Sequence, residues 1–539
     1  MALTRAHARG MLRLPLLATA AWIMLAQPLA AEAATILVRA GADLQQALNG
    51  ARGGDTILLE AGTVFVGNFV LPVRTDREPI TIRTSATGAR LPGDASRVTP
   101  EVSYLLPKLR SPNAEPALRT APGARGWRIV LLEFLGSADG GGEIIRLGDG
   151  GQAQSNLARV PRDIVIDRCY IHAEPEATQK RGVALNSADT TVRNSWISEI
   201  KAIGQDSQAI AGWNGPGPFS ILNNRLEAAG EGFLLGGADP VIRGLVPTDV
   251  TFAGNHVTRP LRWRGSNWQV KNLFELKNAR NVRVYGNLFE NNWRAGQSGH
   301  AILFTPRNQD GAAPWATVED VLFRYNVVRH VAAGMNVLGQ DSPNPSGRCR
   351  RLDVAHNLFY DVDGSAWGGN GDFLLIGDGP ADIAVTHNTI LQTGKIVSVY
   401  GGTAARPTPV QGFVFRSNIV RHNEYGVHGS DRGVGSDTLA TYFPAAVFTG
   451  NVLAGAAQRL YPAGNQFPPA DDFDRLFVDP GGADFRLAQG AQPPRDAAGS
   501  PAGADIVEVN EAWRAAQQGW QARLRKVPPP ERERAQRRR

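Results

Sequence analysis

A pattern of apolar and polar positions recurs along most of this 539-residue chain: apolar, any, apolar, any, any, Asn, any, apolar. One copy is Val282-x-Val284-x-x-Asn287-x-Phe289, and successive copies are 26 to 39 residues apart. Two weaker early copies carry Cys169 and Ser195 in the Asn position. The clear copies are centred on Asn224, Asn255, Asn287, Asn326, Asn357, Asn388, Asn418 and Asn451.

Apolar side chains with a period of two predict a short β-strand, and the Asn that follows predicts a turn. Most units contain a second short apolar strand, such as 273–276 or 301–304. A unit of about 30 residues without a helix cannot bury its own apolar side chains, whereas stacked units can. We therefore predict an all-β solenoid, in which equivalent Asn side chains lie above one another and form hydrogen bonds along the turn. The Asn series then has a structural role.

The chain resembles the right-handed parallel β-helix proteins of the pectate-lyase-like superfamily. The resemblance rests on the Asn series and on the opening segment, where 43–48 (Asp-Leu-Gln-Gln-Ala-Leu) precedes 53–59 (Gly-Gly-Asp-Thr-Ile-Leu-Leu). These two stretches are similar to the short helix that closes such solenoids and to the first strand. The resemblance implies a single-stranded right-handed parallel β-helix of about ten or more coils, with an N-terminal helical cap and a C-terminal helix.

The sequence divides into six segments. We predict a signal peptide over 1–33, the N-terminal cap and first coils over 34–120, β-helix repeats over 121–460 and a closing coil over 461–505. Over 506–525, Trp513, Ala516, Trp520 and Leu524 share one helical face, which predicts a helix that caps the open end of the last coil. The Arg-rich residues 526–539 predict a disordered basic tail.

The first 33 residues predict a secreted or periplasmic protein. Three arginines precede an apolar run over 14–29, and a small-x-small sequence (Ala-Glu-Ala) follows at 31–33. This is typical of a signal peptide cleaved near Ala33, although a retained membrane anchor is an alternative. No later segment has about 18 consecutive apolar residues, so we expect no membrane association after cleavage. We also expect a monomer.

The net charge of +7 does not indicate nucleic acid, because it lies at the two ends of the chain. Residues 1–33 carry +2 and residues 523–539 carry +6, which leaves about −1 for the rest. A near-neutral body lacks the basic surface that a nucleic-acid site needs. Only two cysteines are present, which excludes a disulfide scaffold or a multi-cysteine metal site. Cys169 and Cys349 lie several coils apart, so we predict that they are not bonded to each other.

Familiar catalytic motifs are absent from the sequence. There is no G-x-S-x-G, H-E-x-x-H or P-loop sequence. Glycoside hydrolases of this fold use Gly-His-Gly and Asn-Thr-Asp, and only half of the first occurs, at His300. The Trp-Ile-Asp-His of pectate lyases has a weak counterpart at 165–168 (Val-Ile-Asp-Arg). His356 and His387 directly precede series Asn residues and are assigned to turns. The resemblance thus implies a fold and a polysaccharide substrate, but no catalytic set.

One segment, 263–315, holds four of the eleven tryptophans. Sugar rings stack on aromatic side chains, while amides and charged groups bind their hydroxyl and acid groups. We therefore predict a substrate-binding rim, with the alternative that these tryptophans pack under long loops. The predicted rim residues are Trp263, Trp268, Trp293, Asn308 and Trp315.

The same segment holds the predicted catalytic residues: Lys271, Glu275, Lys277, His300 and Arg307. A lyase must neutralise the carboxylate of a uronate and remove the proton at C5. Arg307 suits the first task, because its planar fork matches a carboxylate, and Lys277 or Lys271 suits the second. Glu275 would orient the lysine, and His300 is an alternative acid or base. A weak surface ion pair between Glu275 and Lys277 is the structural alternative.

These observations predict a secreted polysaccharide lyase that acts on a uronate polymer by β-elimination. A noncatalytic carbohydrate-binding or surface β-helix is the first alternative, and a glycoside hydrolase is the second. We predict that no cofactor or metal is required. The resemblance adds calcium as a candidate, although the sequence shows no ligand cluster for it.

Overall fold

The computed structural model describes residues 33–517 and contains three long parallel sheets of 14, 13 and 12 strands. The first sheet consists of β1 (Thr35–Val38), β2 (Thr56–Leu59), β5 (Ile80–Thr84), β8 (Arg125–Val130), β11 (Arg162–Asp167), β14 (Ala188–Arg193), β17 (Phe219–Leu222), β20 (Thr248–Ala253), β23 (Ala279–Tyr285), β26 (Val318–Arg324), β29 (Arg350–Ala355), β32 (Ala381–Thr386), β37 (Val414–Arg416) and β40 (Val447–Thr449).

The second sheet consists of β3 (Val64–Val66), β6 (Lys108–Arg110), β9 (Glu133–Leu135), β12 (Tyr170–His172), β15 (Trp196–Ile200), β18 (Arg225–Ala228), β21 (His256–Thr258), β24 (Leu288–Asn292), β27 (Val327–Val331), β30 (Leu358–Val362), β33 (Thr389–Gln392), β38 (Ile419–Arg421) and β41 (Val452–Ala454). The third consists of β4 (Phe69–Leu71), β7 (Leu118–Thr120), β10 (Glu143–Leu147), β13 (Arg181–Leu185), β16 (Gln208–Gly212), β19 (Glu231–Leu235), β22 (Asn272–Leu276), β25 (His300–Phe304), β28 (Ala333–Leu338), β31 (Leu374–Gly377), β34 (Val397–Tyr400) and β39 (Val427–Gly429).

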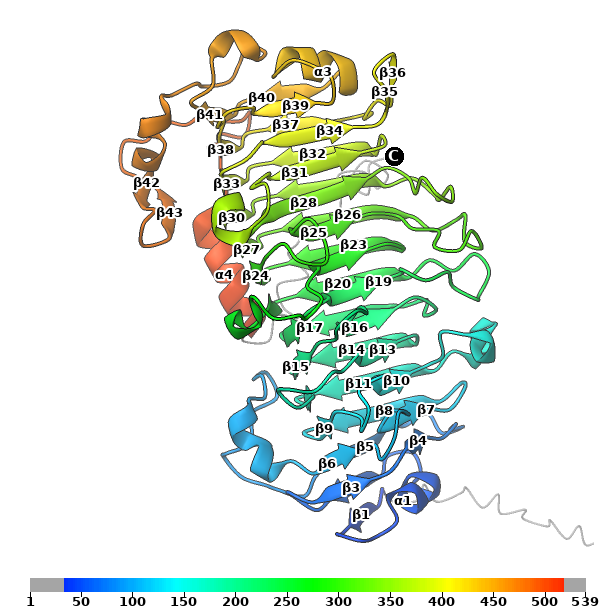
Figure 1. The fold of residues 1–539 in the computed structure, drawn as a ribbon. Helices are drawn as coiled ribbons and strands as arrows, with labels where there is room; N and C mark the ends of the chain where they lie inside the picture. Colours follow the sequence, from blue (N-terminus) through cyan, green and yellow to red (C-terminus); the bar gives the residue numbers. More distant parts are fainter. Residues whose placement is uncertain (1–32, 518–539) are drawn as a thin grey trace, which may run out of the picture.

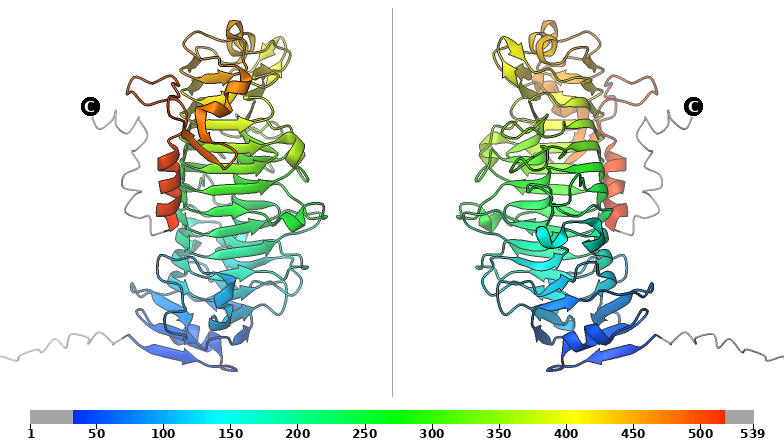
Figure 2. Two further views of the ribbon diagram at one scale, coloured as in Figure 1. Left: turned by 90° about the vertical axis from the view of Figure 1, so that its left-hand side faces the viewer. Right: turned by 90° about the vertical axis from the view of Figure 1, so that its right-hand side faces the viewer.

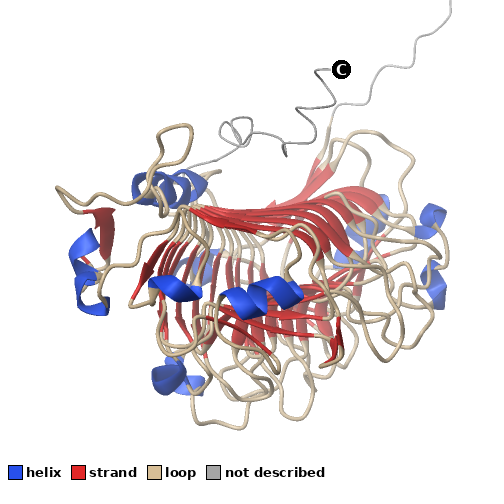
Figure 3. Ribbon diagram, turned by 90° about the horizontal axis from the view of Figure 1, so that it is seen from above, coloured by secondary structure: helices blue, strands red, loops and turns tan. Residues whose placement is uncertain are grey.

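From β2 to β39 each coil passes through the first, second and third sheet in turn, and within each sheet a strand pairs in parallel with the equivalent strands of the neighbouring coils. The coils stack into a column with β1 at one end (Figure 1), and the three sheets surround a common interior when seen along the axis (Figure 3). This is a right-handed parallel β-helix, which confirms the predicted fold class.

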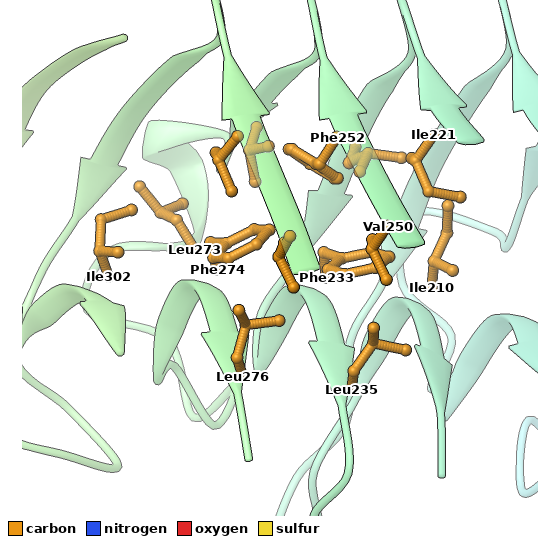
Figure 4. Packing of buried hydrophobic residues seen from close by; sticks show 14 of the residues in the cluster. Ile210, Ile221, Phe233, Leu235, Val250, Phe252, Leu273, Phe274, Leu276 and Ile302 are labelled. Carbon is orange, nitrogen blue, oxygen red and sulfur yellow. The ribbon is translucent and has the colours of Figure 1, made fainter. Parts of the chain in front are cut away.

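The core runs the length of the solenoid as stacks of identical or similar side chains (Figure 4). Phe233 and Phe274 occupy the same register position on neighbouring third-sheet strands, and their ring centroids are 5.4 Å apart. Phe252 and Phe289 stack in the same way at 6.1 Å. Because a coil alone cannot enclose these side chains, each coil depends on its two neighbours for burial.

The Asn series forms the hydrogen-bonded ladder predicted from the sequence. From Asn224 to Asn451, each Nδ2 donates to the Oδ1 of the next Asn at 2.8–3.2 Å. Cys169 and Ser195 occupy ladder positions as predicted, because the Cys169 amide donates to Ser195 Oγ. Asn465, which the pattern did not identify, extends the ladder beyond Asn451 at 2.9 Å.

The residue before a ladder Asn turns the chain. His356 and His387 have φ values of 56° and 52°, in the left-handed region, and their rings stack at 5.0 Å. This confirms that these two histidines belong to turns. Cys169 and Cys349 are both buried and unbonded, as predicted.

Within residues 33–517, four α-helices and two short antiparallel hairpins lie outside the three long sheets. The helices are α1 (Leu44–Gly50), α2 (Gly364–Trp367), α3 (Ser436–Tyr442) and α4 (Ile506–Gln517); the hairpins are β35 (Gly402–Thr403) with β36 (Arg406–Pro407), and β42 (Phe477–Asp479) with β43 (Asp484–Leu487). The predicted cap helix is α1: it is capped by Asp43 and buries Leu44 and Leu48 against the first coils. At the other end, α3 buries Leu439 and Tyr442 in the core.

The C-terminal helix does not cap the open end, so that prediction is wrong. Residues 484–517, here called the C-terminal strap, run back along the flank of the solenoid, and α4 lies against the middle coils (Figure 2). Gly503 donates to the Ser417 carbonyl, whereas the Trp513 ring lies 6.2 Å from His256, several coils nearer the N-terminus. The helix buries Ile506 and Val509 on the flank because Leu358 and its neighbours leave an apolar surface there.

Three predicted segments lie partly or wholly outside the described residues: the signal peptide, the end of the C-terminal helix and the basic tail. Within 33–517, no helix is long and apolar enough to cross a membrane.

Candidate functional site

The third sheet presents a row of polar side chains to the outside. Glu143, Arg181, Gln208 and Glu231 open their strands and occupy equivalent register positions. The next two residues of each strand face the core. At Gly232, for example, an added Cβ would lie 2.2 Å from the core residue Val257, and Phe233, which follows, belongs to the core. This break in the alternation leaves the first residue of each strand on the outer face.

A groove of about 610 Å³ runs along this row. Its walls come from six successive third-sheet coils, from β10 to β25, which at the usual strand spacing span roughly 24 Å along the axis. The lining residues are Glu143, Lys180, Arg181, Gln205, Asp206, Gln208, Ala211, Trp213, Glu231, Leu234, Gly236, Gly237, Ala238, Lys271, Lys277, Arg307 and Gln309. The structure thus brings together Lys271, Lys277 and Arg307, three of the five predicted catalytic residues.

Cations outnumber carboxyl groups in this lining. Five side chains are basic (Lys180, Arg181, Lys271, Lys277 and Arg307) and three are acidic (Glu143, Asp206 and Glu231). Two further carboxylates, Glu275 and Asp341, pair with Lys277 and Arg307 from behind the lining, so the excess of cations is a feature of the groove surface, where it favours the acid groups of a ligand.

Four side chains form a hydrogen-bonded line along the groove. Arg181 Nη1 lies 2.7 Å from Glu143, while its Nε and Nη2 donate to Gln208 Oε1 at 3.1 and 2.9 Å. Gln208 Nε2 then donates to Glu231 Oε2 at 3.0 Å. The Arg181 guanidinium also lies 4.9 Å from the centre of the Trp213 ring. These contacts hold Arg181 and Gln208 in one orientation.

Glu231 is the most perturbed acid of the groove. Its side chain is only 2% exposed, and Lys271 Nζ is 3.8 Å from Oε1, beyond hydrogen-bond distance. Burial, followed by the negative charges of Glu275 and Asp206, raises the pKa of Glu231 to about 8. Glu231 is therefore mostly protonated at neutral pH.

Lys271 is held as a cation. Its Nζ lies 2.6 Å from Asp206 Oδ1. Burial alone would lower the pKa of Lys271, but the carboxyl groups of Glu231 and Asp206 raise it above its ordinary value. This argues against Lys271 as a base and favours it as a partner for a substrate carboxylate.

Lys277 and Arg307 are each paired with a buried carboxylate. Lys277 Nζ lies 3.0 Å from Oε1 of Glu275, whose Oε2 has no hydrogen-bond partner among the described residues. Arg307 Nη1 lies 3.0 Å from Asp341, which also accepts the backbone N–H of Asn308. Glu275 is fully buried, so it contacts Lys277 from behind without lining the groove.

His300 does not line the groove. It is 2% exposed, its Nδ1 lies 3.0 Å from Ser298 Oγ, and its buried Nε2 has no hydrogen-bond partner within the part of the chain that the structure describes. Burial lowers the pKa of His300 to about 4, so the ring is neutral at neutral pH.

The predicted rim residues lie mostly in packed positions. Trp263 and Trp293 are buried in one apolar cluster, against which Trp268 packs. Trp315 is half-buried and donates to a backbone carbonyl, and Asn308 is buried within a turn. The aromatic side chain that the structure places in the groove is instead Trp213.

The sequence patterns do not predict four groove residues: Glu231, Gln208, Arg181 and Trp213. One signal could have found the first three: they occupy the same offset within successive coils. Aligning the coils on their third-sheet strands would have shown charged or amide side chains where the neighbouring positions are apolar.

Calcium does not fit the groove. Within 33–517, no three His, Cys, Asp or Glu side chains lie close enough to hold a metal ion. The carboxylates of Glu143, Asp206 and Glu275 each lie within 3.0 Å of a cationic side chain, whereas calcium needs six to eight oxygen ligands.

Comparisons with known proteins found similarity in structure only: no family model and no curated protein sequence matches the chain. A mannuronic-acid-specific polysaccharide lyase from the human gut microbiota is similar at 10% identity, with a TM-score of 0.48 over 82% of this chain and 93% of that one. The A-module of mannuronan C-5 epimerase AlgE4 from Azotobacter vinelandii is similar at 12% identity, with a TM-score of 0.38 over 75% and 94%.

The catalytic unit of an α-1,3-glucanase from Streptomyces thermodiastaticus is similar at 14% identity, with a TM-score of 0.39 over 80% of this chain and 69% of that one. At this distance the likeness extends to the fold alone. The chain is a right-handed parallel β-helix protein. Its reaction has to be argued from the groove, because one fold serves many chemistries.

Proposed function

We propose that this protein is a polysaccharide lyase that cleaves a uronate-containing polymer by β-elimination. One observation carries the proposal: a groove across six coils presents five cations against three carboxyl groups, one of them protonated at neutral pH. A groove of this length suits a chain-like ligand, and its charge suits an acidic one.

The cations serve the first requirement of the reaction. The C5 proton of a uronate becomes acidic when the adjacent carboxylate is neutralised. Arg307, oriented by Asp341, offers a planar fork to that carboxylate, and Lys271 adds a second fixed positive charge.

Lys277 is the proposed base. Its side chain lines the groove, and its Nζ is held 3.0 Å from Oε1 of the buried Glu275. Among the cations of the groove, a lysine can act as a base, whereas an arginine stays protonated.

The test is an assay on polymannuronate, polyguluronate, polygalacturonate and polyglucuronate, with ultraviolet absorbance reporting the C4=C5 double bond. We expect unsaturated product from at least one polymer. Reducing ends without this absorbance would indicate a glycoside hydrolase, and binding without products would indicate a carbohydrate-binding protein.

Lys277→Met should abolish turnover without unfolding the protein. Lys108→Met is the matched control, because Lys108 is also ion-paired (2.9 Å from Glu133) and similarly exposed, 20% against 23%, but lies on the second sheet outside the groove. Full activity in the Lys277 variant would remove Lys277 from the mechanism.

Secretion and a monomeric state are parts of the same proposal. The solenoid begins at Thr35, directly after the predicted cleavage site near Ala33. N-terminal sequencing of the exported protein is expected to start close to Ala34.

A further inference from the structure

We propose that Glu231 is the proton donor to the leaving glycosidic oxygen, and that Gln208, fixed by Arg181, holds its acidic hydroxyl toward the groove. The inference rests on the proposed function, and it adds a residue that the reaction needs and that the sequence does not identify.

The orientation of Gln208 follows from Arg181. A guanidinium has donors only, so the Gln208 oxygen must face the two Arg181 N–H groups, at 3.1 and 2.9 Å. The amide NH₂ of Gln208 must then face Glu231, to which it donates at 3.0 Å. An inverted amide would place NH₂ against N–H groups and leave Glu231 without this donor.

The orientation of Gln208 in turn fixes the proton of Glu231. Because Oε2 accepts the Gln208 N–H, it is the carbonyl oxygen of the protonated acid, and the hydroxyl is Oε1. No hydrogen bond from the described residues engages Oε1, and Lys271 Nζ is 3.8 Å from it. The hydroxyl is thus available to a ligand in the groove that Glu231 lines.

Charged groups on several elements surround Glu231. Glu275 on the neighbouring strand β22 and Asp206 in the loop before β16 oppose its ionisation, whereas Lys271 favours it. Arg181 on β13 and the buried Arg259, after β21, also interact with Glu231: burial lowers the pKa of each arginine, and the charge of Glu231 opposes that lowering. Burial is the largest cause of the shift and brings the pKa of Glu231 to about 8, so the acid is protonated at neutral pH.

The step balances without any further reactant. The base takes the C5 hydrogen as a proton, and the C–H electron pair becomes the C4=C5 double bond. The C4–O4 bond breaks, and O4 takes the proton from Glu231 Oε1. The resulting carboxylate lies beside Lys271 and Arg181, and it regains a proton from solvent before the next turnover.

The experiment compares two substrates over a range of pH: the uronate polymer and a uronate with a nitrophenyl ether at C4, whose leaving group needs no proton. For the polymer, we expect kcat/KM to fall as pH rises above about 8, because Glu231 then loses its proton. This fall is the basic limb of the pH profile. Glu231→Gln should lose about 10²–10⁴-fold in polymer turnover, lose that limb and keep turnover of the nitrophenyl ether. Equal loss on both substrates, or full polymer turnover, would overturn the proposal.

Gln208 is a positioning residue and has its own readout. Its N–H stabilises the carboxylate form of Glu231, so Gln208→Ala should move the basic limb to higher pH. Glu133→Gln is the matched control, because Glu133 lies on β9 of the second sheet, outside the groove. Burial alone would raise the pKa of Glu133, but hydrogen bonds from His172, Ser103 and Lys108 lower it, so this carboxyl is charged and the limb should stay in place. A limb that vanishes in the control would belong to another group.

A spectroscopic arm separates this inference from the proposed function. With ¹³C-labelled glutamate carboxyl groups, the ¹³C NMR difference spectrum between wild type and Glu231→Gln at neutral pH should show the signal of a protonated carboxyl group. A carboxylate signal would refute the inference whatever the activity. A protonated signal without activity on any uronate would leave the lyase proposal as the part that failed.

Discussion

At the residue scale, the groove contains pairs in which a buried carboxylate positions a half-buried cation. Asp341 holds Arg307 at 3.0 Å, while the Arg307 Nε donates to Gln309. Arg307→Lys would keep the charge but lose the planar fork. A hydrogen bond to a charged group contributes about 1.5–3 kcal/mol, so kcat/KM on a uronate polymer should fall about 10–100-fold.

Initial rates with the unsaturated product as readout would measure this loss. Arg432→Lys, in an exposed turn outside the groove, should leave kcat/KM unchanged. An equal loss in both variants would indicate a general effect of arginine replacement.

Acid should destabilise the protein through its buried histidines. Burial, and then the charge of His387, lowers the pKa of His356 to about 4, below its ordinary 6.5. Between these pH values the unfolded chain binds a proton that the folded chain does not, so stability is lost as pH falls from about 6.5 to 4. The loss is about 2–3 kcal/mol for this group.

Urea titrations at several pH values would test this. His356→Asn tolerates the left-handed backbone (φ 56°) and removes the titration, so its stability should depend less on pH. An unchanged dependence would assign the acid sensitivity to other groups, such as His300.

At the element scale, the ladder ties each turn to the next. Asn357 Nδ2 donates to Asn388 Oδ1 and to the Phe323 carbonyl of the preceding coil. Asn357→Ala would leave these buried groups without partners, at a cost of about 1–3 kcal/mol. Thermal melts should show a lower Tm with unchanged binding of uronate oligomers. Asn510→Ala, exposed on α4, should change neither, and an unaltered Tm for Asn357→Ala would contradict the ladder.

The C-terminal strap should detach without unwinding the solenoid, because its apolar cluster is separate from the main core. Val509→Asp buries a charge against Leu358 and its neighbours, which destabilises the contact by about 3 kcal/mol or more. Limited proteolysis should then cut the strap while the β-sheet circular dichroism signal persists. Val507→Asp, on the exposed face of the same helix, is the control. Loss of the β-sheet signal would show that the strap and solenoid unfold together.

The elements that repeat were predictable, and those that occur once were not. Ten positions from Cys169 to Asn451 indicate the same turn, so a wrong assignment at one position is exposed by the other nine. Helix α4 occurs once, and its apolar face fits either an open coil end or a solenoid flank. Contacts such as Val509 with Leu358 join distant segments, and no local pattern records them.

The candidate site was predictable only in part for a similar reason. Lys271, Lys277 and Arg307 lie on adjacent coils, and a solenoid places such residues side by side. The tryptophans suggested a sugar-binding rim, but Trp263 and Trp293 pack with each other beneath a loop. Glu231 stood alone in its segment, and its partners Gln208 and Lys271 become visible only when the coils are aligned.

At the scale of the whole molecule, charge is distributed unevenly. The body of the chain is close to neutral, so the excess of cations in the groove is a local feature. Binding of uronate oligomers should therefore weaken as salt increases, since salt screens these charges. Calorimetric titrations at low and high salt would measure this. Neutral oligosaccharides of equal length should bind weakly at both, and salt-independent binding would argue against a charge-selective groove.

The path of the C-terminal strap also has a consequence for the order in which parts of the molecule fold. Coils stack on their predecessors, so winding can follow synthesis, each new turn using the previous one as its template. The strap is made last, yet Gly503 and Trp513 reach back across coils completed well before it. A chain truncated before the C-terminal strap lacks this contact, and the apolar surface around Leu358 stays uncovered. In the complete molecule the C-terminal strap is bound along the flank, so the last coils can unfold from the C-terminal end only after the strap has dissociated.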